Sequence, residues 1–551
     1  MRHPTTESTK IFAARKIITL NNYCPSATHV AVREGRVLGV GALDDLTGWG
    51  DYELDTRFAD CVLMPGFVEG HGHSSEGQYW QHTYIGFYDR RDPSGRLWPG
   101  LKSLDACIER LQLAHDELSD TKQTLCAWGF DPIFFADQRM TVQHLDRVSD
   151  ARAILVMHAS GHIINVNSEI LRRAGFDRST NITGVNKDSH GEPTGELQEL
   201  APQFRAQRVA GDPLTAVMDK SVLDDFARAA VNAGVTTSTD LYAEVDEISV
   251  NHYLAATKAA DFPVRLVPAM NALSLSVDDG IRRLAEIKEF NHDKLHFGIC
   301  KLMTDGSIQG FTGRLKWPGY YNGRPNGIWH TPPDTLMDRV SRFHAAGVHL
   351  HIHTNGDEAS ELALDAIEQA LLETPRWDHR HTLQHCQMAD VAQFRRMKAL
   401  GMCVNLFANH LYYWGDQHVA YTLGPDRAQR INAVGTALRL GVPVAIHSDV
   451  PVTPLAPMFT AWCAVNRCSA SGKVLGPDER VSVADALAAI TLGPAYTLRL
   501  DHLVGSIEPG KFADFAVLGE DPFSVVPSSL KDVPVVGTVL GGVAYQAAGS
   551  V

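Results

Sequence analysis

The central part of the chain alternates short apolar segments with amphipathic helical segments, and this pattern limits the fold more than any other feature. Val348–Ile352 precedes a helical stretch at Glu358–Leu372, and Val442–Ile446 precedes a helix near Pro457–Arg467. Such an alternation is typical of parallel strands joined by helices that cross from one strand to the next. The sequence therefore predicts an α/β fold with a parallel sheet.

Polar residues end these apolar segments at a regular spacing. His385 lies 32 residues after His353, and Asp449 lies 64 residues after His385. A strand, a helix and their connections occupy roughly 30 residues, so these residues are about one and two β/α units apart. The spacing favours a (β/α)8 TIM-like barrel.

Both ends of the chain have the composition of short β-strands. Lys10–Leu20 and Thr28–Val40 are apolar and β-branched, with a hairpin turn at Glu34-Gly35. Phe512–Leu518 and Val533–Tyr545 have the same character near the C-terminus. We therefore expect a small β-sandwich domain that both termini build together.

A long segment after the first predicted barrel strand interrupts the alternation. It is rich in Trp, Tyr, Gly and Pro, and it is too long for a single loop between a strand and a helix. We predict an insertion at about residues 75–208 inside a barrel domain of residues 63–500. Residues 1–62 and 501–551 then form the two parts of the β-sandwich.

The 551-residue chain carries a formal net charge of −14, spread along its length. A nucleic acid or an anionic membrane would require a basic face, so neither is an expected partner. Nine cysteines without a Cys-x-x-Cys pair suit a reducing compartment. The N-terminus has no apolar signal segment, and no apolar run reaches about 18 residues. We expect a cytoplasmic protein that acts on a small molecule, and we leave a homodimer open.

Two histidines end the first predicted barrel strand. Within Val62–His73, a Pro-Gly turn leads into a short apolar strand that ends in His71 and His73. Side chains at positions i and i+2 of a strand point to the same side, so both imidazoles can approach one metal ion. Gly70 and Gly72 let the backbone pack closely. The alternative is a pair of surface histidines in a loop.

Three more histidines alternate along one later strand. Val, Leu and Ile occupy one face of Val348–Ile352, and His349, His351 and His353 occupy the other. His353 lies at the carboxyl end, where the active sites of barrels lie. His349 and His351 lie deeper, and we expect them to be interior histidines satisfied by hydrogen bonds.

Three further polar residues lie in or at the end of apolar strands. His385 and Asp449 each end a strand, and a carboxylate there needs a reason because unpaired burial is costly. Lys301 lies inside an apolar strand. It could pair with a carboxylate such as Glu69 or Asp305, or it could react with CO₂ to form a carbamate that bridges two metal ions.

Taken together, these residues place nitrogen and carboxylate ligands at the ends of several barrel strands. Such a set suits one or two Zn²⁺-like ions with open coordination positions. The predicted metal ligands are His71, His73, Lys301, His353, His385 and Asp449.

The motifs around these residues resemble those of the amidohydrolase superfamily, and most closely its YtcJ-like (Amidohydro_3) branch, which includes N-substituted formamide deformylases. Pro65–His73 fits the family's Pro-Gly-Phe-x-Asp-x-His-x-His with Glu69 in place of Asp. His447–Val452 fits its Gly-Ser-Asp-x-Pro-Val with His447 in place of Gly. The other matching segments are Lys301–Ser307, His353–Ala359, His385 and the closing Gly505–Asp514.

The insertion resembles the same branch. Gly161–Ser168 and Gly191–Glu199 match two of its segments, which implies that His162 and Glu199 lie near the substrate. The alternative for His162 is a helix cap or a loop hydrogen bond. His410 stands where the family often has Gln-Pro-x-His, and it is a further candidate for substrate binding although the Gln-Pro is missing here.

The resemblance implies metal-dependent hydrolysis of a carbonyl–nitrogen bond in an amide, an N-substituted formamide or an N-acyl amine. One or two Zn²⁺ or other divalent ions would activate water, with Lys301 carbamylated in a two-ion site. Asp449 would take the proton of the water, and His162 would help to polarise the carbonyl group. Aromatic residues of the insertion favour a small apolar or aromatic substrate, although most of them are expected to form core.

Several alternatives stay open at this point. A deaminase, or a cyclic-amide, carbamate or ester hydrolase, would use the same ligands on the same scaffold. A non-catalytic regulatory homologue is disfavoured by the complete ligand set. Hydrolysis by a nucleophilic Ser or Cys, or by a zinc-protease helix, is disfavoured because neither Gly-x-Ser-x-Gly nor His-Glu-x-x-His occurs.

Overall fold

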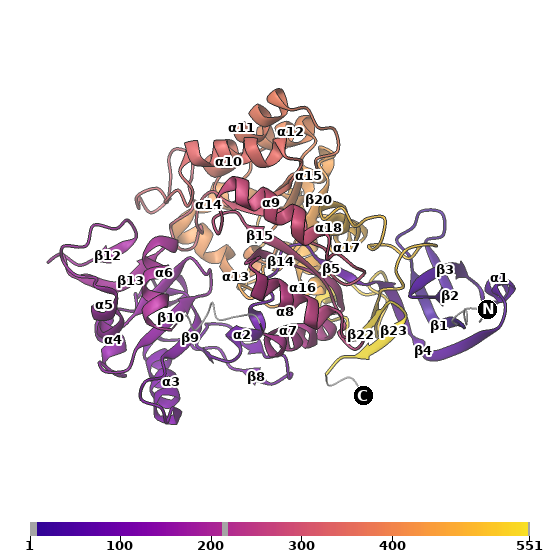
Figure 1. The fold of residues 1–551 in the computed structure, drawn as a ribbon, viewed down its shortest axis with the longest axis horizontal. Helices are drawn as coiled ribbons and strands as arrows, with labels where there is room; N and C mark the ends of the chain where they lie inside the picture. The colour runs from indigo at the N-terminus through magenta and orange to yellow at the C-terminus, as the bar shows by residue number, and fades with distance from the viewer. Residues whose placement is uncertain (1–7, 212–218, 549–551) are drawn as a thin grey trace.

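Eight parallel strands form the centre of the molecule in the computed structural model, which describes residues 8–211 and 219–548 (Figure 1). Each strand pairs with the next one in sequence. The strands are β5 (Phe67–Glu69), β14 (Val235–Ala243), β15 (Arg265–Asn271), β16 (Ile299–Met303), β17 (His349–Thr354), β18 (Thr382–His385), β19 (Cys403–Leu406) and β20 (Val444–Ile446).

The segments that follow the first and the last of these strands lie side by side. Gly72 and Val450 form an isolated parallel bridge, and the Asp449 N–H donates to the His71 carbonyl oxygen at 3.1 Å. These contacts bring the two edges of the sheet together at the carboxyl ends of the strands. The arrangement is consistent with the predicted TIM-like barrel.

Helices follow the strands in the predicted alternation. Amphipathic α7 shows the local cause, because Asp219 caps its first turn by accepting from the backbone N–H groups of Ser221 and Val222. Leu223, Phe226 and Ala230 then fall on one face and are buried in the central core. The helices around the barrel are α7 (Lys220–Asn232), α8 (Glu247–Thr257), α9 (Val277–Lys288), α10 (Pro333–Ala345), α11 (Asp357–Glu373), α12 (Val391–Leu400), α15 (Val434–Arg439), α16 (Pro457–Asn466), α17 (Val483–Ala489) and α18 (Leu492–Thr497).

Strands from both termini form one seven-stranded sheet beside the barrel. A hairpin turn at Glu34 and Gly35, with φ angles of 51° and 71°, joins two of these strands as the sequence predicts. In sheet order the strands are β23 (Val543–Gln546), β22 (Val535–Leu540), β21 (Phe515–Leu518), β4 (Tyr52–Pro65), β1 (Thr9–Ile18), β2 (Ser26–Arg33) and β3 (Arg36–Gly41). The sandwich arrangement and the domain boundaries stay predictions.

The insertion after β5 folds around a sheet of its own, and it forms the purple and magenta lobe at the left of Figure 1. Its apolar core includes Trp128, Ile164 and Leu197. In sheet order its strands are β12 (Val185–Lys187), β13 (Pro193–Gln198), β11 (Ile163–Val166), β10 (Ile154–His158), β9 (Leu125–Phe130) and β6 (Thr83–Tyr84). Its main helices are α3 (Leu104–Glu117), α4 (Val142–Asp146), α5 (Ser168–Ala174) and α6 (Leu200–Val209).

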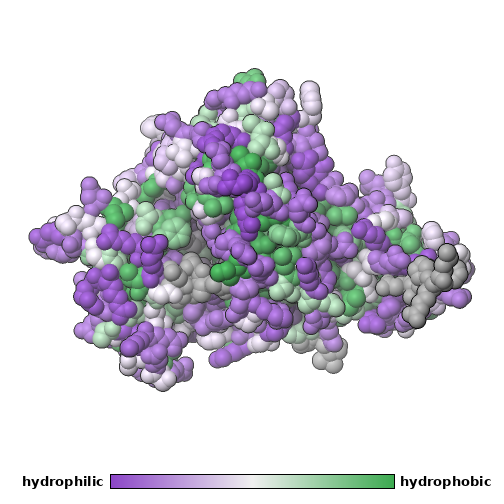
Figure 2. All heavy atoms as spheres, viewed as in Figure 1, coloured by the Kyte–Doolittle hydropathy of each residue, from purple (hydrophilic) through white to green (hydrophobic). Residues whose placement is uncertain are grey.

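Hydrophilic residues cover much of the face shown in Figure 2, with smaller apolar areas between them. Among the helices of the described residues, none has the length and apolar character needed to cross a membrane.

The two deeper histidines of β17 are interior, as the sequence predicts. His349 Nε2 donates to the Arg380 carbonyl oxygen at 2.7 Å, and His351 Nε2 donates to the Thr497 carbonyl oxygen at 3.2 Å. Burial lowers the pKa of His349 to about 3 and the pKa of His351 well below its usual value. Both rings are therefore neutral in the folded protein near neutral pH.

Because these two histidines are buried as neutral rings, we expect the folded protein to lose stability in mild acid. In the unfolded chain a histidine takes up its proton as the pH falls below about 6.5, whereas these buried rings do not. Stability is therefore fully present above this pH, and each ring costs up to ~1.4 kcal/mol per pH unit below it. Urea unfolding of the metal-free protein between about pH 5.5 and 7.5 measures the slope.

A matched pair of variants isolates one ring. Glutamine can still donate to the Arg380 carbonyl oxygen but does not titrate, so His349→Gln should flatten the slope by up to ~1.4 kcal/mol per pH unit. The exposed His190 is the control, and His190→Gln should leave the slope unchanged. Equal slopes in both variants and the wild type would contradict this explanation.

Candidate active site

A cavity of about 470 Å³ lies at the carboxyl ends of the barrel strands, with residues of the insertion forming part of its wall. This volume is in the range of pockets that hold small molecules. The cavity brings together every site residue that the sequence predicts, although these residues are spread over almost 400 positions. They are His71, His73, His162, Glu199, Lys301, His353, His385, His410 and Asp449.

Two histidine nitrogens approach the same carboxylate oxygen. The Nε2 atoms of His71 and His73 each lie 3.3 Å from Asp449 Oδ1. His71 and His73 follow β5, and Asp449 follows β20, so the contact of the first and last barrel strands brings them together. Asp449 has a φ of 55°, a conformation that is costly outside glycine and that clusters at functional sites.

Lys301 is buried beside this group. Its Nζ lies 3.4 Å from His71 Nε2, and no carboxylate of residues 8–211 and 219–548 lies within ion-pair distance of it. The predicted alternative of a pair with Glu69 or Asp305 is therefore wrong. Burial lowers the pKa of the Lys301 amine to about 7, although Asp449 opposes the shift. Much of the amine is then neutral near pH 7, which is the form that reacts with CO₂.

The two carboxylates considered as partners of Lys301 bind elsewhere. Glu69 accepts from the His71 N–H at 3.1 Å and from the Ser448 hydroxyl at 2.7 Å. Asp305 accepts backbone N–H groups of the segment after β17, including that of Gly356 at 2.9 Å. Glu69, which replaces the family's Asp, thus connects the segments that carry the metal-ligand candidates.

His353 and His385 complete a group of neighbouring imidazoles. The ring centroids of His353 and His385 are 4.6 Å apart, and those of His385 and His71 are 4.4 Å apart. His353 Nε2 lies 3.3 Å from the Gly306 carbonyl oxygen and 3.6 Å from Asp305 Oδ1. The four predicted histidine ligands therefore share one side of the cavity with Lys301 and Asp449.

His162 and Glu199 form a pair on the insertion side of the cavity. His162 Nδ1 donates to Glu199 Oε2 at 3.0 Å, and the His162 ring lies 5.3 Å from that of His353. Burial disfavours the charged imidazole, but the Glu199 carboxylate outweighs this cost and raises the pKa of His162. The pair can therefore hold a protonated ring whose other nitrogen is free to donate.

His410 lies at the first position of α13 (His410–Gln417). Its ring stacks on Trp414 at a centroid distance of 4.3 Å, and its Nδ1 lies 3.0 Å from His418 Nε2. The side chain lines the cavity but is held by its own neighbours, so it fits a wall residue better than a metal ligand.

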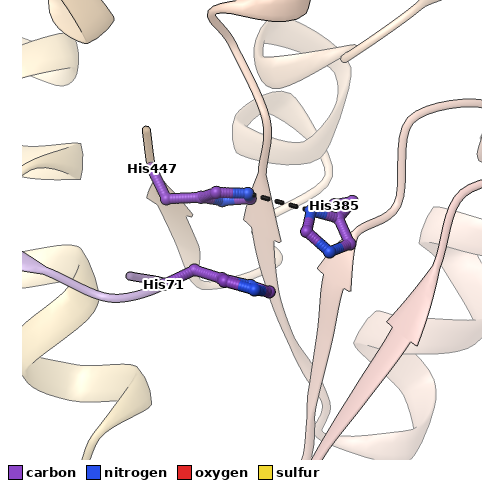
Figure 3. Close-up of side chains that lie close together, drawn as sticks. All are labelled: His71, His385 and His447. Atoms are coloured by element: carbon purple, nitrogen blue, oxygen red, sulfur yellow. Dashed lines mark hydrogen bonds between the residues drawn. The ribbon is translucent and has the colours of Figure 1, made fainter. Parts of the chain in front are cut away.

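His447 is a site residue whose role sequence reasoning missed. It lies next to both His71 and His385 (Figure 3), with its ring stacked on that of His71 at 4.7 Å and its Nε2 3.0 Å from His385 Nδ1. The only signal in the sequence was a histidine in place of the family's glycine, two positions before Asp449. Gln384 and Asn405, which contact these histidines, gave no signal beyond being polar residues in short strands.

Two sets of side chains place their donor atoms close enough to hold a metal ion. One contains His71, His73 and Asp449, and the other contains His71, His385 and His447. Imidazole nitrogens with a carboxylate are the ligand types of zinc and similar divalent ions. The donor set of the cavity therefore fits a divalent metal ion.

The sequence pattern of the amidohydrolase family matches residues 59–545, which is most of the chain. The chain belongs to the amidohydrolase family. It is 26% identical to YtcJ of Bacillus subtilis (strain 168), a match that covers 93% of this chain and 94% of YtcJ. It is also 26% identical to an N-substituted formamide deformylase of Arthrobacter pascens, over 97% of both chains.

Solved structures support the fold. A metal-dependent hydrolase from Pyrococcus horikoshii OT3, described as uncharacterized, superposes with a TM-score of 0.72 at 19% sequence identity. The match covers 94% of this amidohydrolase and 99% of the archaeal chain. The predicted membership of the YtcJ-like branch is confirmed.

Proposed function

We propose that this amidohydrolase cleaves the carbonyl–nitrogen bond of a small amide, N-substituted formamide or N-acyl amine. The observation that carries the proposal is the convergence of two imidazole nitrogens on Asp449 Oδ1, in a cavity that also holds Lys301 and two further histidines. The similarity to an N-substituted formamide deformylase supports the choice of bond.

His71, His73, His353, His385 and Asp449 would hold one or two divalent ions, and a carbamate on Lys301 would serve as a bridge between two. When bound, such an ion lowers the pKa of water and polarises a carbonyl oxygen. Zn²⁺ is the ion we propose, because four of the ligands are histidines.

The protein's own groups move the protons. Asp449 accepts a proton from the attacking water and returns it to the leaving nitrogen. The water oxygen forms a bond with the carbonyl carbon, the carbon–nitrogen bond breaks, and a carboxylic acid and an amine leave. His162, held by Glu199 through Nδ1, donates from its other nitrogen to the carbonyl oxygen as negative charge develops there.

The cavity wall supports an apolar or aromatic group on the substrate. Among the aromatic residues of the insertion, Tyr79, Trp128 and Phe204 line the cavity, and Tyr242, Tyr253 and Phe407 from outside the insertion join them. The others pack mainly against one another, as Phe130 does with Phe135 at a centroid distance of 5.2 Å. We propose that the substituent on the nitrogen or the acyl group packs between the lining aromatics.

A substrate panel tests the bond type. Amides, N-benzyl and N-methyl formamides, carbamates, esters, cyclic amides and amino-heterocycles are assayed on protein of measured metal content. The proposal predicts turnover of acyclic amides or formamides, with the aromatic member preferred over the methyl member. Turnover confined to the amino-heterocycles, cyclic amides, carbamates or esters would contradict it in favour of the corresponding hydrolase or deaminase.

His162→Ala is expected to lower kcat by ~10²–10³-fold, the effect of losing one donor to a developing oxyanion. The metal content should not change, because His162 is not among the proposed ligands. His190→Ala removes an exposed histidine from the same insertion and should leave kcat unchanged. Loss of metal together with activity in His162→Ala would contradict the assigned role.

Glu199→Gln should move the pH dependence of kcat. Because the Glu199 carboxylate raises the pKa of His162, its neutralisation lets the imidazole lose its proton at a lower pH. The alkaline limb of the kcat profile, where the protonated donor is lost, should therefore shift toward lower pH. An unchanged alkaline limb would show that His162 does not act as a protonated donor.

A further inference from the structure

A buried chain of hydrogen bonds begins at a backbone carbonyl below the cavity. The Thr497 carbonyl oxygen can only accept, so the His351 Nε2 atom 3.2 Å away carries the proton. A buried imidazole without a charged partner is neutral, because burying the charge is costly. His351 Nδ1 must therefore accept, and its donor is Gln384 Nε2 at 2.7 Å.

The orientation of the Gln384 amide determines the tautomer of His71, the first of the metal-ligand candidates. With its amide nitrogen directed to His351, its Oε1 accepts from His71 Nδ1 at 2.7 Å. The single proton of the neutral His71 ring is then on Nδ1, and Nε2 keeps its lone pair. That Nε2 is the atom beside Asp449 Oδ1 and Lys301 Nζ.

The same glutamine oxygen starts a second branch. It also accepts from Asn405 Nδ2 at 3.0 Å, which leaves Asn405 Oδ1 to accept from His447 Nδ1 at 3.1 Å. His447 Nε2 must then accept, and its donor is His385 Nδ1 at 3.0 Å (Figure 3). His385 Nε2 therefore keeps its lone pair, as His71 Nε2 does. Asp449 Oδ2, 3.7 Å from His385 Nδ1, is beyond hydrogen-bond distance.

We propose that this chain of hydrogen bonds, from the Thr497 carbonyl through Gln384 and Asn405 to His447, holds His71 and His385 in the tautomer that binds metal through Nε2. His447 is thus a positioning residue. The inference rests on the proposed metal-dependent function and adds the group that orients its ligands. Outer hydrogen-bond partners of metal-binding histidines typically change metal affinity about 10–100-fold.

The contacts of His447 fit positioning better than direct metal binding. Both of its nitrogens are engaged, Nδ1 with Asn405 and Nε2 with His385, and its ring is stacked between His71 and Phe407 at centroid distances of 4.7 and 4.9 Å. The family's motif has glycine at this position. In this protein, His447 therefore supplies a hydrogen-bond partner for His385 that glycine would not.

Three variants separate the roles of His447. His447→Phe keeps a flat ring but removes both hydrogen bonds, and His447→Gln keeps one donor and one acceptor. His447→Gly restores the family's residue and serves as a second deletion of the hydrogen bonds if the Phe variant folds poorly. His344→Phe is the control, because His344 is an equally buried, hydrogen-bonded histidine that makes no contact with the proposed ligands.

The measurements are the Zn²⁺ dissociation constant, from competition with a chelator, and the visible absorption of the Co²⁺-loaded protein. We expect His447→Phe and His447→Gly to bind Zn²⁺ about 10–100-fold more weakly than the wild type. His447→Gln should stay within about threefold, with the wild-type Co²⁺ spectrum, and His344→Phe should bind as the wild type does.

Three results would overturn the inference. Wild-type Zn²⁺ affinity in both His447→Phe and His447→Gly would show that the chain of hydrogen bonds does not position the ligands. A changed Co²⁺ spectrum in His447→Gln would show that His447 is itself a ligand. If the wild-type protein binds neither Zn²⁺ nor Co²⁺, the proposed function fails together with the inference. The first two results, in contrast, would overturn the inference alone.

Discussion

Asp449→Asn is expected to lower kcat by ~10²–10⁴-fold, the usual contribution of a positioned general acid or base. Asparagine has nearly the same shape but cannot take a proton from water. Its side-chain oxygen can still face the Nε2 atoms of His71 and His73, which lie 3.3 Å from Asp449 Oδ1. Most of the metal should therefore remain bound while turnover is lost.

The measurement is kcat on an acyclic amide or formamide, with metal per chain determined on the same sample. Asp501→Asn is the control, because Asp501 pairs with Arg380 away from the cavity and the variant should keep full activity. An Asp449→Asn enzyme that retains wild-type kcat would contradict the proton-transfer role. If the variant loses metal in parallel with activity, the result would indicate that Asp449 acts only as a metal ligand and not in proton transfer.

Lys301→Ala is expected to lower kcat/KM by ~10²–10³-fold, about the effect of losing one group that stabilises charge in the transition state. Lys301 is buried, its Nζ contacts His71 Nε2 at 3.4 Å, and it has no carboxylate partner within the described ranges. Because burial lowers the pKa of this amine to about 7, its neutral form, which reacts with CO₂, is available near pH 7. The substitution removes both the amine and the carbamate.

Rescue distinguishes the two states of Lys301. If a carbamate bridges two ions, a short carboxylate such as acetate or formate should restore part of the activity of Lys301→Ala, and the wild type should bind two ions. If the amine acts uncarbamylated, the carboxylates should not rescue and the wild type should bind one ion. Lys398→Ala, at an exposed position on α12, is the control and should behave as the wild type. Wild-type activity in Lys301→Ala would contradict any role of Lys301 at the site.

The sequence could predict the barrel and the placement of its site because both depend on local pattern. An apolar run that ends in His353, His385 or Asp449 predicts a strand and also the end of that strand at which the side chain lies. In parallel strands these ends meet at one edge of the sheet. All nine predicted residues therefore line one cavity.

Pairings between distant side chains could not be predicted in the same way. The expected partners of Lys301 are instead bound to Ser448 and to backbone N–H groups, because the segments after β5 and β20 come closer than sequence spacing can indicate. The chain through Gln384 and Asn405 depends on which face of each short strand points inward. Only the folded structure shows that His71 and Gln384, which are 313 positions apart, share a hydrogen bond.

The insertion is the part of the fold that the sequence described least. Its length and composition excluded a simple loop, but they did not reveal a six-stranded sheet with its own core. Three antiparallel pairs stand beside two parallel pairs in that sheet, without a regular repeat of strand and helix. The motif around His162 was nevertheless informative, because its hydrogen bond to Glu199 joins two segments of the insertion that face the barrel.

We propose that His71, His73, His353, His385 and Asp449 form a metal-dependent hydrolytic centre. The most direct test is to measure metal per chain and amide or formamide turnover on the same wild-type sample, before chelation, after chelation and after stepwise reloading with Zn²⁺. The proposed mechanism predicts that turnover disappears in the metal-free protein and returns in proportion to bound Zn²⁺ or a similar divalent ion. Full turnover by protein that contains no metal would contradict it.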